Sequence, residues 1–180
     1  MKWLQYQINR NSLFTNYKVN KFKGHISPNC SFCSHVEGVS HLELVSHLFW
    51  ECDFALKLWL EVKNWLQTNF DVCIPLDRKI LLFGFHDQSS GSVKNYIILC
   101  VKYFIWKAKF QSGELCFLAF QQYLKFKLED LQNAYLFKGK DHKFVPWMLI
   151  YDCLSRIQCT GTSEALLPPS SPTSLAPVLV

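Results

Sequence analysis

Residues 30–52 read CSFCSHVEGVSHLELVSHLFWEC, and this stretch decides how the rest of the chain is interpreted. Cys30 and Cys33 are separated by two residues, His47 and Cys52 by four, and thirteen residues lie between Cys33 and His47. Zinc prefers four thiolate and imidazole ligands in a tetrahedron, and two cysteines at this separation form a tight turn that supplies half of them. The spacing therefore predicts a zinc site made by Cys30, Cys33, His47 and Cys52.

The second half of this site requires a break in the backbone. Residues five apart on one α-helix point about 140° away from each other, so His47 and Cys52 cannot reach one ion from a continuous helix. Asp53 is of a residue type that favours the N-cap, and we expect a new helix to begin there. Residues 47–51 then form a short turn that presents both ligands, with Phe49 and Trp50 packed beneath it.

His41 competes with His47 for the third ligand position, because VSHL occurs at 39–42 and again at 45–48. His47 keeps the short spacing to Cys52, whereas His41 keeps a short spacing to Cys33. We favour His47, since only that copy is followed by the LFWEC that leads into the next helix. The alternative is a loop that binds no metal, which the added His-x4-Cys spacing disfavours.

The composition indicates one globular domain that is mainly α-helical. The 180 residues include 15 Phe, 7 Tyr and 6 Trp, enough for a substantial core, but only 7 Gly and 7 Pro. The longest near-apolar run, 96–106, is interrupted by Lys102 and is shorter than the ~18 residues of a membrane span. The amino terminus lacks the apolar core of a secretory signal. We therefore expect an intracellular protein with no membrane span.

An intracellular location also changes how the 8 cysteines are interpreted. A reducing compartment disfavours structural disulfides, so clustered cysteines favour metal binding. The scattered ones fit the core or the surface, and several lie in apolar helical patterns where cysteine behaves as a small hydrophobe. These scattered residues are Cys73, Cys100, Cys116, Cys153 and Cys159.

Apolar periodicity predicts the order of the helices. We expect short helices over 3–13 and 14–22, the second capped by Thr15, an amphipathic helix from Asp53 to Phe70, and a connector containing a short extended or helical segment at 80–85. A helical hairpin over 92–111 and 114–137 and a last helix over 144–157 follow. The predicted parts are short basic helices (1–24), a zinc-knuckle segment (25–53), a helical region packed on it as one domain (54–157) and a disordered tail (158–180).

Charge is distributed in blocks along the chain. Residues 1–36 contain five Lys or Arg and no Asp or Glu, residues 37–77 contain seven acidic residues against two Lys, and residues 78–143 contain eleven bases against five acids. Two basic surfaces of this kind suit a polyanionic partner. Ordinary solvated charge is the alternative, since the pI of 8.7 lies below the ~9 typical of nucleic-acid-binding domains.

Two groups of basic residues are candidates for contact with phosphate. The first lies near the predicted knuckle and comprises Arg10, Lys18, Lys21 and Lys23. The second would form an exposed basic face on the long helices and comprises Lys102, Lys107, Lys109, Lys125 and Lys127. Phosphate contacts provide affinity with little sequence preference, so we expect binding to RNA or single-stranded DNA without sequence specificity.

Motifs of catalysis are missing from the sequence. It contains no Gly-rich phosphate loop, no Gly-x-Ser-x-Gly elbow and no pair of neighbouring aspartates suited to catalytic magnesium. Aromatic residues at helical spacing are interpreted as core. We therefore expect a binding protein and not an enzyme.

Three segments together resemble a known family. LQYQINRNSLFTNYKV at 4–19, ISPNCSFC at 26–33 and VSHLFWEC at 45–52, followed by a Trp-containing helix, are similar to the zinc-binding region that follows the reverse transcriptase domain in non-LTR (LINE-type) retrotransposon polyproteins. The resemblance extends more weakly through ILLFGF and YIILCVKYFIWKAKF, to about residue 157. This chain differs in having a longer gap between Cys33 and His47, which the repeated VSHLEL accounts for.

The resemblance implies that Cys30, Cys33, His47 and Cys52 bind zinc and that the region holds RNA or DNA near a polymerase. The carboxylates of the family's polymerase and nuclease are not in this chain, so the resemblance implies a non-catalytic carboxy-terminal remnant of such a polyprotein. Two alternatives remain open. The chain is either a structural or protein-interaction helical module in which zinc secures the fold, or the product of a truncated element with no selected function.

Overall fold

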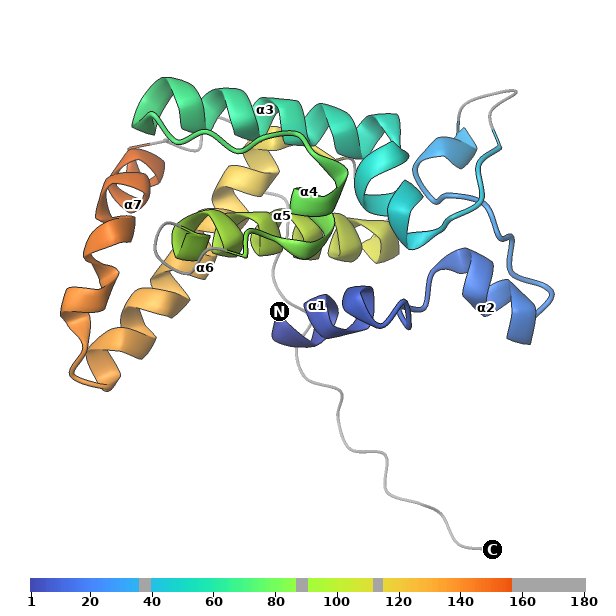
Figure 1. Ribbon diagram of the computed structural model, residues 1–180, viewed down its shortest axis with the longest axis horizontal. Coiled ribbons are helices and arrows are strands. Elements are labelled where there is room, and N and C mark those ends of the chain that lie inside the picture. Colours follow the sequence, from blue (N-terminus) through green and yellow to red (C-terminus); the bar gives the residue numbers. More distant parts are fainter. Residues whose placement is uncertain (36–39, 87–90, 112–114, 157–180) are drawn as a thin grey trace, which may run out of the picture.

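The computed structural model describes residues 1–35, 40–86, 91–111 and 115–156, and these residues are mainly helical (Figure 1). The α-helices are α1 (Lys2–Asn9), α2 (Asn16–Phe22), α3 (Asp53–Phe70), α4 (Arg78–Phe83), α5 (Gly91–Gln111), α6 (Phe117–Phe137) and α7 (Met148–Ser155). Short helical turns are η1 (Cys33–His35), η2 (His47–Glu51) and η3 (Asp141–Trp147). The predicted mainly α class is confirmed. The tail predicted for 158–180 lies outside the described residues.

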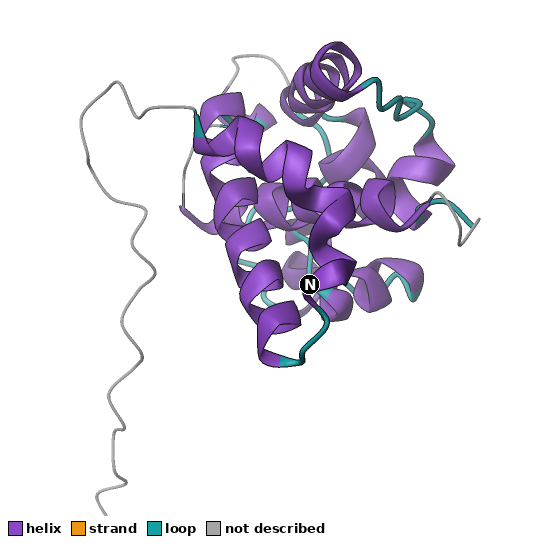
Figure 2. Cartoon of the chain, turned by 90° about the vertical axis from the view of Figure 1, so that its left-hand side faces the viewer, coloured by secondary structure: helices purple, strands orange, loops and turns teal. Residues whose placement is uncertain are grey.

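β-structure in the described ranges is limited to one isolated antiparallel bridge, between Asn29 and Leu42. Figure 2 shows the same region turned by 90°, with helices packed on one another and loops joining them. The two long helices α5 and α6 contact each other, as the predicted hairpin requires, and α6 also packs against η3 and α7. The segment that carries the four predicted metal ligands lies at the α2 end of the molecule, far from η3 (Figure 1).

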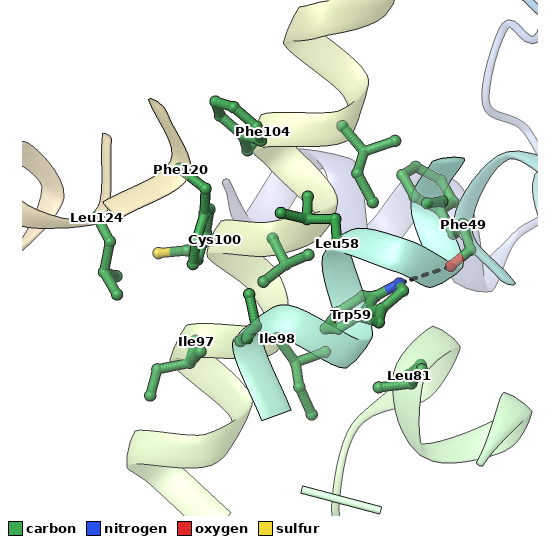
Figure 3. Close-up of a cluster of buried hydrophobic side chains, with 14 of the residues drawn as sticks. Phe49, Leu58, Trp59, Leu81, Ile97, Ile98, Cys100, Phe104, Phe120 and Leu124 are labelled. Carbon is green, nitrogen blue, oxygen red and sulfur yellow. Dashed lines mark hydrogen bonds between the residues drawn. The ribbon is translucent and has the colours of Figure 1, made fainter. Parts of the chain in front are cut away.

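One hydrophobic cluster joins most of these elements, and its members run from Leu4 to Leu154. Figure 3 shows its centre, where Leu58 and Trp59 of α3 meet residues of α5 and α6. Trp59 is 1% exposed, and its indole N–H donates to the backbone carbonyl of Phe49 at 2.8 Å. Because removing a buried Trp side chain costs about 3–5 kcal/mol, Trp59 is a main contributor to the packing of η2 against α3.

Several helix ends differ from the predicted ones. Asp53 is the first residue of α3 and not its cap, because Cys52 occupies the cap position with extended dihedral angles (φ −72°, ψ 124°). Thr15 does precede α2 but makes no side-chain capping bond. The last helical segment begins as the 3₁₀ turn η3, which contains Pro146, and continues as α7 from Met148. α6 begins at Phe117, three residues later than predicted.

The predicted exposed basic face on the long helices is wrong for two of its lysines. Lys102 is 1% exposed, and its Nζ donates to the Leu82 carbonyl at 2.9 Å and to the Gln5 side chain. The Lys109 side chain is 4% exposed and pairs with Glu43. Ile98 and Ile105, one helical turn from Lys102, are also buried, so the lysine lies on the core side of α5.

Among the scattered cysteines that the structure describes, burial differs, Cys153 being half-buried, and Cys159 lies outside the described residues. Cys100 is fully buried, where burial raises its pKa to about 12, whereas Cys73 and Cys116 are exposed. None of the described helices combines the length and the apolar character that a membrane span requires.

Candidate metal centre

The first half of the candidate metal site is the turn that carries Cys30 and Cys33, and backbone hydrogen bonds hold it. The N–H of Cys30 donates to the carbonyl of His41 at 2.8 Å, and the N–H of Glu43 donates to the carbonyl of Pro28 at 2.9 Å. A further bond from Ser34 N–H to the Cys30 carbonyl, at 3.0 Å, closes the turn between the two cysteines. This pairing fixes the backbone on both sides of Cys30 and leads into Cys33.

The second half is the π-helical turn η2. The N–H of Cys52 donates to the carbonyl of His47 at 2.8 Å, a bond that spans five residues and closes the wider π ring. After this turn Cys52 is extended, and α3 begins at Asp53. The predicted break in the helix is present, and it allows two residues five apart to face the same point.

The four predicted ligands meet at one place. Their sulfur and nitrogen atoms all lie within 4.8 Å of one another. Cys33 Sγ is 3.6 Å from Cys52 Sγ and 3.5 Å from His47 Nε2, and Cys30 Sγ is 4.0 Å from Cys52 Sγ. With Zn–S bonds of about 2.3 Å and Zn–N bonds of about 2.0 Å, tetrahedral geometry requires about 3.8 Å between sulfurs and about 3.5 Å between sulfur and nitrogen. The four side chains therefore fit a tetrahedral metal ion.

All four side chains are buried, and the surroundings of Cys30, Cys33 and His47 favour the neutral form of each of these three. The pKa of the Cys30 thiol is raised well above its usual range, first by its hydrogen bond with Cys52 and then by burial. Burial raises the pKa of Cys33 to about 11, and burial followed by the charge of His41 lowers that of His47. A divalent cation among these atoms would reverse the preference of the thiols, because a coordinating thiol is deprotonated.

His41 lies beside the cluster and is not part of it. Its ring centroid is 5.1 Å from that of His47, but the group of converging ligand atoms contains His47 and leaves His41 outside. The backbone of His41 is held by Cys30, and its side chain is exposed. The two histidines therefore occupy different structural positions, His41 in the paired loop and His47 in η2.

Glu43 is a structural residue that sequence reasoning missed. It is 0% exposed, and its carboxylate accepts from the Asn16 N–H at 2.8 Å, from the Ser31 N–H at 3.1 Å and from the Ser31 hydroxyl at 2.9 Å. Lys109 Nζ of α5 is the fourth donor, at 2.5 Å. Local hydropathy could not have found this residue, because its neighbours Leu42 and Leu44 are the exposed ones, at 47% and 41%.

The basic residues predicted near the knuckle lie on and around α1 and α2. Arg10, Lys21 and Lys23 are exposed and Lys18 is half-buried. The Arg10 guanidinium lies 5.7 Å from the ring centroid of Tyr6, and Lys21 Nζ lies 4.5 Å from that of Tyr17. The ion pairs found among the described residues are Arg78–Glu51, Lys109–Glu43 and Lys127–Asp130, so none of the four is paired with a carboxylate there.

The fold and the site together define a class: a mainly α-helical chain with a buried Cys₃His cluster that can hold a metal ion. Comparisons with family models, with curated proteins and with solved structures found no match to this chain.

Proposed function

We propose that the chain is a zinc-stabilised, non-catalytic nucleic-acid-binding module, of the kind that follows the reverse transcriptase domain in non-LTR retrotransposon polyproteins. The observation that carries the proposal is a buried Cys₃His cluster with tetrahedral spacing next to a basic segment without carboxylate partners among the described residues. When bound, zinc would supply a cross-link between the loop that carries Cys30 and the turn that carries Cys52.

Zinc is the ion that the donor set favours. Thiolate and imidazole are soft or borderline ligands, and magnesium and calcium require oxygen ligands instead. Four protein ligands leave no open coordination position, which is typical of a structural and not a catalytic zinc site. Burial of all four side chains agrees with that role.

The basic segment suits a polyanion. Residues 1–35 contain five Lys or Arg and no acidic residue. Arg10 and Lys21 each lie over a tyrosine ring, an arrangement that orders the cation and combines it with a surface on which a base can stack. Because these are phosphate-type contacts, binding should depend strongly on salt and weakly on sequence.

A salt titration of binding to a single-stranded RNA tests the proposal. For single strands the slope of log K against log salt is about −0.7 per phosphate neutralised, so replacing Arg10, Lys18, Lys21 and Lys23 by Gln should make the slope less steep by about 2 to 3. The matched control replaces Lys57, Lys138, Lys140 and Lys143, four exposed lysines outside the basic segment, which changes the net charge equally. Equal loss of slope in the two variants would contradict the proposal.

A protein-interaction module is the second candidate, and one observation favours it. Large apolar side chains on and beside α1 and α2 are exposed, including Trp3 at 54%, Phe14 at 58% and Phe22 at 80%. Where exposed apolar side chains form one contiguous patch, that patch marks a protein-binding site. Binding to RNA that is absent or insensitive to salt would favour this candidate over the first.

A further inference from the structure

A surface groove lies between the basic segment and α4. It has a volume of about 340 Å³ and is lined by the end of α1, the start of α2, residues 44–46 before η2, and α4. Its buried lining residues are Ile8, Thr15 and Leu82, at 3%, 1% and 4% exposure, and its exposed ones include Phe83 at 51%. Three segments that are distant in sequence therefore build one concave site, and one of them, residues 44–46, leads directly into the candidate metal ligand His47.

The groove combines positive charge with aromatic and amide groups. Lys18 comes from α2 and Arg78 from α4, so the two cations reach the groove from different elements, and no acidic residue is among those that line it. Tyr17 and Phe83 provide aromatic rings, and Asn9 and Asn11 provide amides. Cations recognise phosphate, aromatic rings stack with bases, and amides hydrogen-bond to base edges.

The ion pair that Arg78 forms with Glu51 is weak. Glu51 Oε1 lies 3.9 Å from an Arg78 guanidinium nitrogen, and both side chains are exposed, at 43% and 59%. A long, exposed ion pair of this kind contributes little stability, so a phosphate dianion or diester can replace it. Arg78 is therefore available to a ligand in the groove.

We propose that this groove binds one nucleotide of a single strand, with its phosphate between Lys18 and Arg78 and its base against Phe83. The inference rests on the proposed nucleic-acid binding and deepens it, because it names the part of the strand that is recognised and adds α4 to the basic segment. The volume is at the lower end of the ~300–1,000 Å³ of ligand pockets, and bases of a duplex are not free to enter a pocket. The groove thus selects an unpaired base.

Binding of the zinc-loaded 180-residue chain to a short fluorescent oligouridylate, measured by anisotropy, tests the phosphate contact. Arg78 and Lys79 are adjacent, exposed residues of α4, and only Arg78 lines the groove. Arg78→Gln should weaken binding by about three- to tenfold, while Lys79→Gln should change it by less than about twofold. The two variants remove the same charge, so equal effects on binding would contradict the proposed phosphate contact in the groove.

The base contact is tested with a second strand of the same length that lacks bases. Phe83→Ala should weaken binding of the oligouridylate about tenfold and leave binding of the abasic strand unchanged, because a stacking contact needs a base. Equal effects of Phe83→Ala on both strands would overturn the base contact. Wild type is the reference for separating the two proposals. If it binds the oligouridylate with a steep salt slope and Arg78→Gln and Phe83→Ala bind as tightly as wild type, the proposed nucleotide site in the groove is wrong and the proposed function stands. If wild type binds neither strand, both proposals are wrong.

Discussion

Lys109 Nζ lies 2.5 Å from Glu43 Oε1, and the two side chains are 4% and 0% exposed. The lysine also lies 4.9 Å from the ring centroid of Trp106 and 5.1 Å from that of Phe110. Since Glu43 also accepts bonds from Asn16 and Ser31, this ion pair joins α5 to α2 and to the loop that carries the first two cysteines. One buried carboxylate therefore links α5 to the start of α2 and to the loop between Cys30 and Cys33.

Breaking this pair should be costly. Lys109→Met leaves a buried carboxylate without its cation, and loss of one partner of a buried pair typically costs about 3–5 kcal/mol of unfolding free energy. Urea unfolding measures the effect, and Lys107→Met, an exposed neighbour on the same helix, should cost less than about 0.5 kcal/mol. In a double-mutant cycle with Glu43→Gln we expect a coupling of at least about 1 kcal/mol. Additive effects would show that the two side chains contribute independently.

Substitution of the clustered cysteines should remove the metal. We expect about one zinc per chain, lost in Cys30→Ser and in Cys52→Ser, because serine is a poor zinc ligand. Amide exchange across residues 25–60 should accelerate in both variants, since zinc binding is coupled to folding of this segment. Elemental analysis measures the zinc, with the exposed Cys73→Ser as a control that should retain it. Equal zinc in Cys30→Ser and wild type would rule the site out.

The two histidines should behave differently when each is replaced. His47→Ala removes a converging ligand and should weaken zinc binding by more than tenfold, which corresponds to about 1.4 kcal/mol. His41→Ala should change affinity by less than that, because its side chain lies outside the cluster. Competition with a chromogenic chelator compares the two variants directly. Loss of zinc in His41→Ala with retention in His47→Ala would reverse the assignment, and loss only in the double variant would mean that the two rings exchange.

The indole hydrogen bond of Trp59 should hold the π turn in place. Trp59→Phe leaves the Phe49 carbonyl without its 2.8 Å donor and should lower the unfolding free energy by about 1–3 kcal/mol. Because the same turn presents His47 and Cys52, zinc should also dissociate faster from this variant. Trp65→Phe, a half-buried position on the same helix, is the control and should leave the dissociation rate unchanged. Equal rates of zinc dissociation from wild type and both variants would show that the hydrogen bond does not affect the metal site.

Lys102 should make stability depend on pH. Burial lowers its pKa in the folded protein to about 7, below the ~10.4 of an unfolded chain. Between these values the unfolded state binds more protons, so stability should rise with pH from about 7 to about 10, by at most about 1.4 kcal/mol per pH unit. Lys102→Met should lack this increase. Urea unfolding of both proteins at several pH values measures the difference in slope, and parallel pH profiles would contradict the prediction.

Local pattern was sufficient for the helices and for the convergence of the four metal-type residues. The three- and four-residue apolar spacing of residues 55–70 and 92–111 reports burial directly, because one side of a helix faces the core. The candidate metal site could be predicted from the sequence for a similar reason. A tight Cys-x2-Cys turn and a helix start at Asp53 are local features, and each places two of the four residues.

The burial of individual charged residues could not be predicted from local sequence patterns, because it depends on residues that are distant in sequence. Lys102 and Lys109 are charged residues on a helix and were predicted to be exposed, yet Gln5, Leu82 and Glu43, which lie more than a dozen residues away in sequence, provide their partners. A lone lysine at core spacing in an apolar run is a signal that could have indicated burial. Glu43 carries no such signal, since its two neighbours are leucines that the fold leaves exposed.

The amino-acid sequence alone thus specified the mainly helical class, the order of the helices and the residues able to meet at a metal. Each of these depends on spacing within a few residues, and backbone geometry converts such spacing into direction. Tertiary structure alone decided which cations are buried, which carboxylate joins the metal-type loop to α5, and that Arg78 lies with Lys18 in one groove. Those features depend on which helices pack together, and the packing results from burial summed over the whole core, which no short segment encodes.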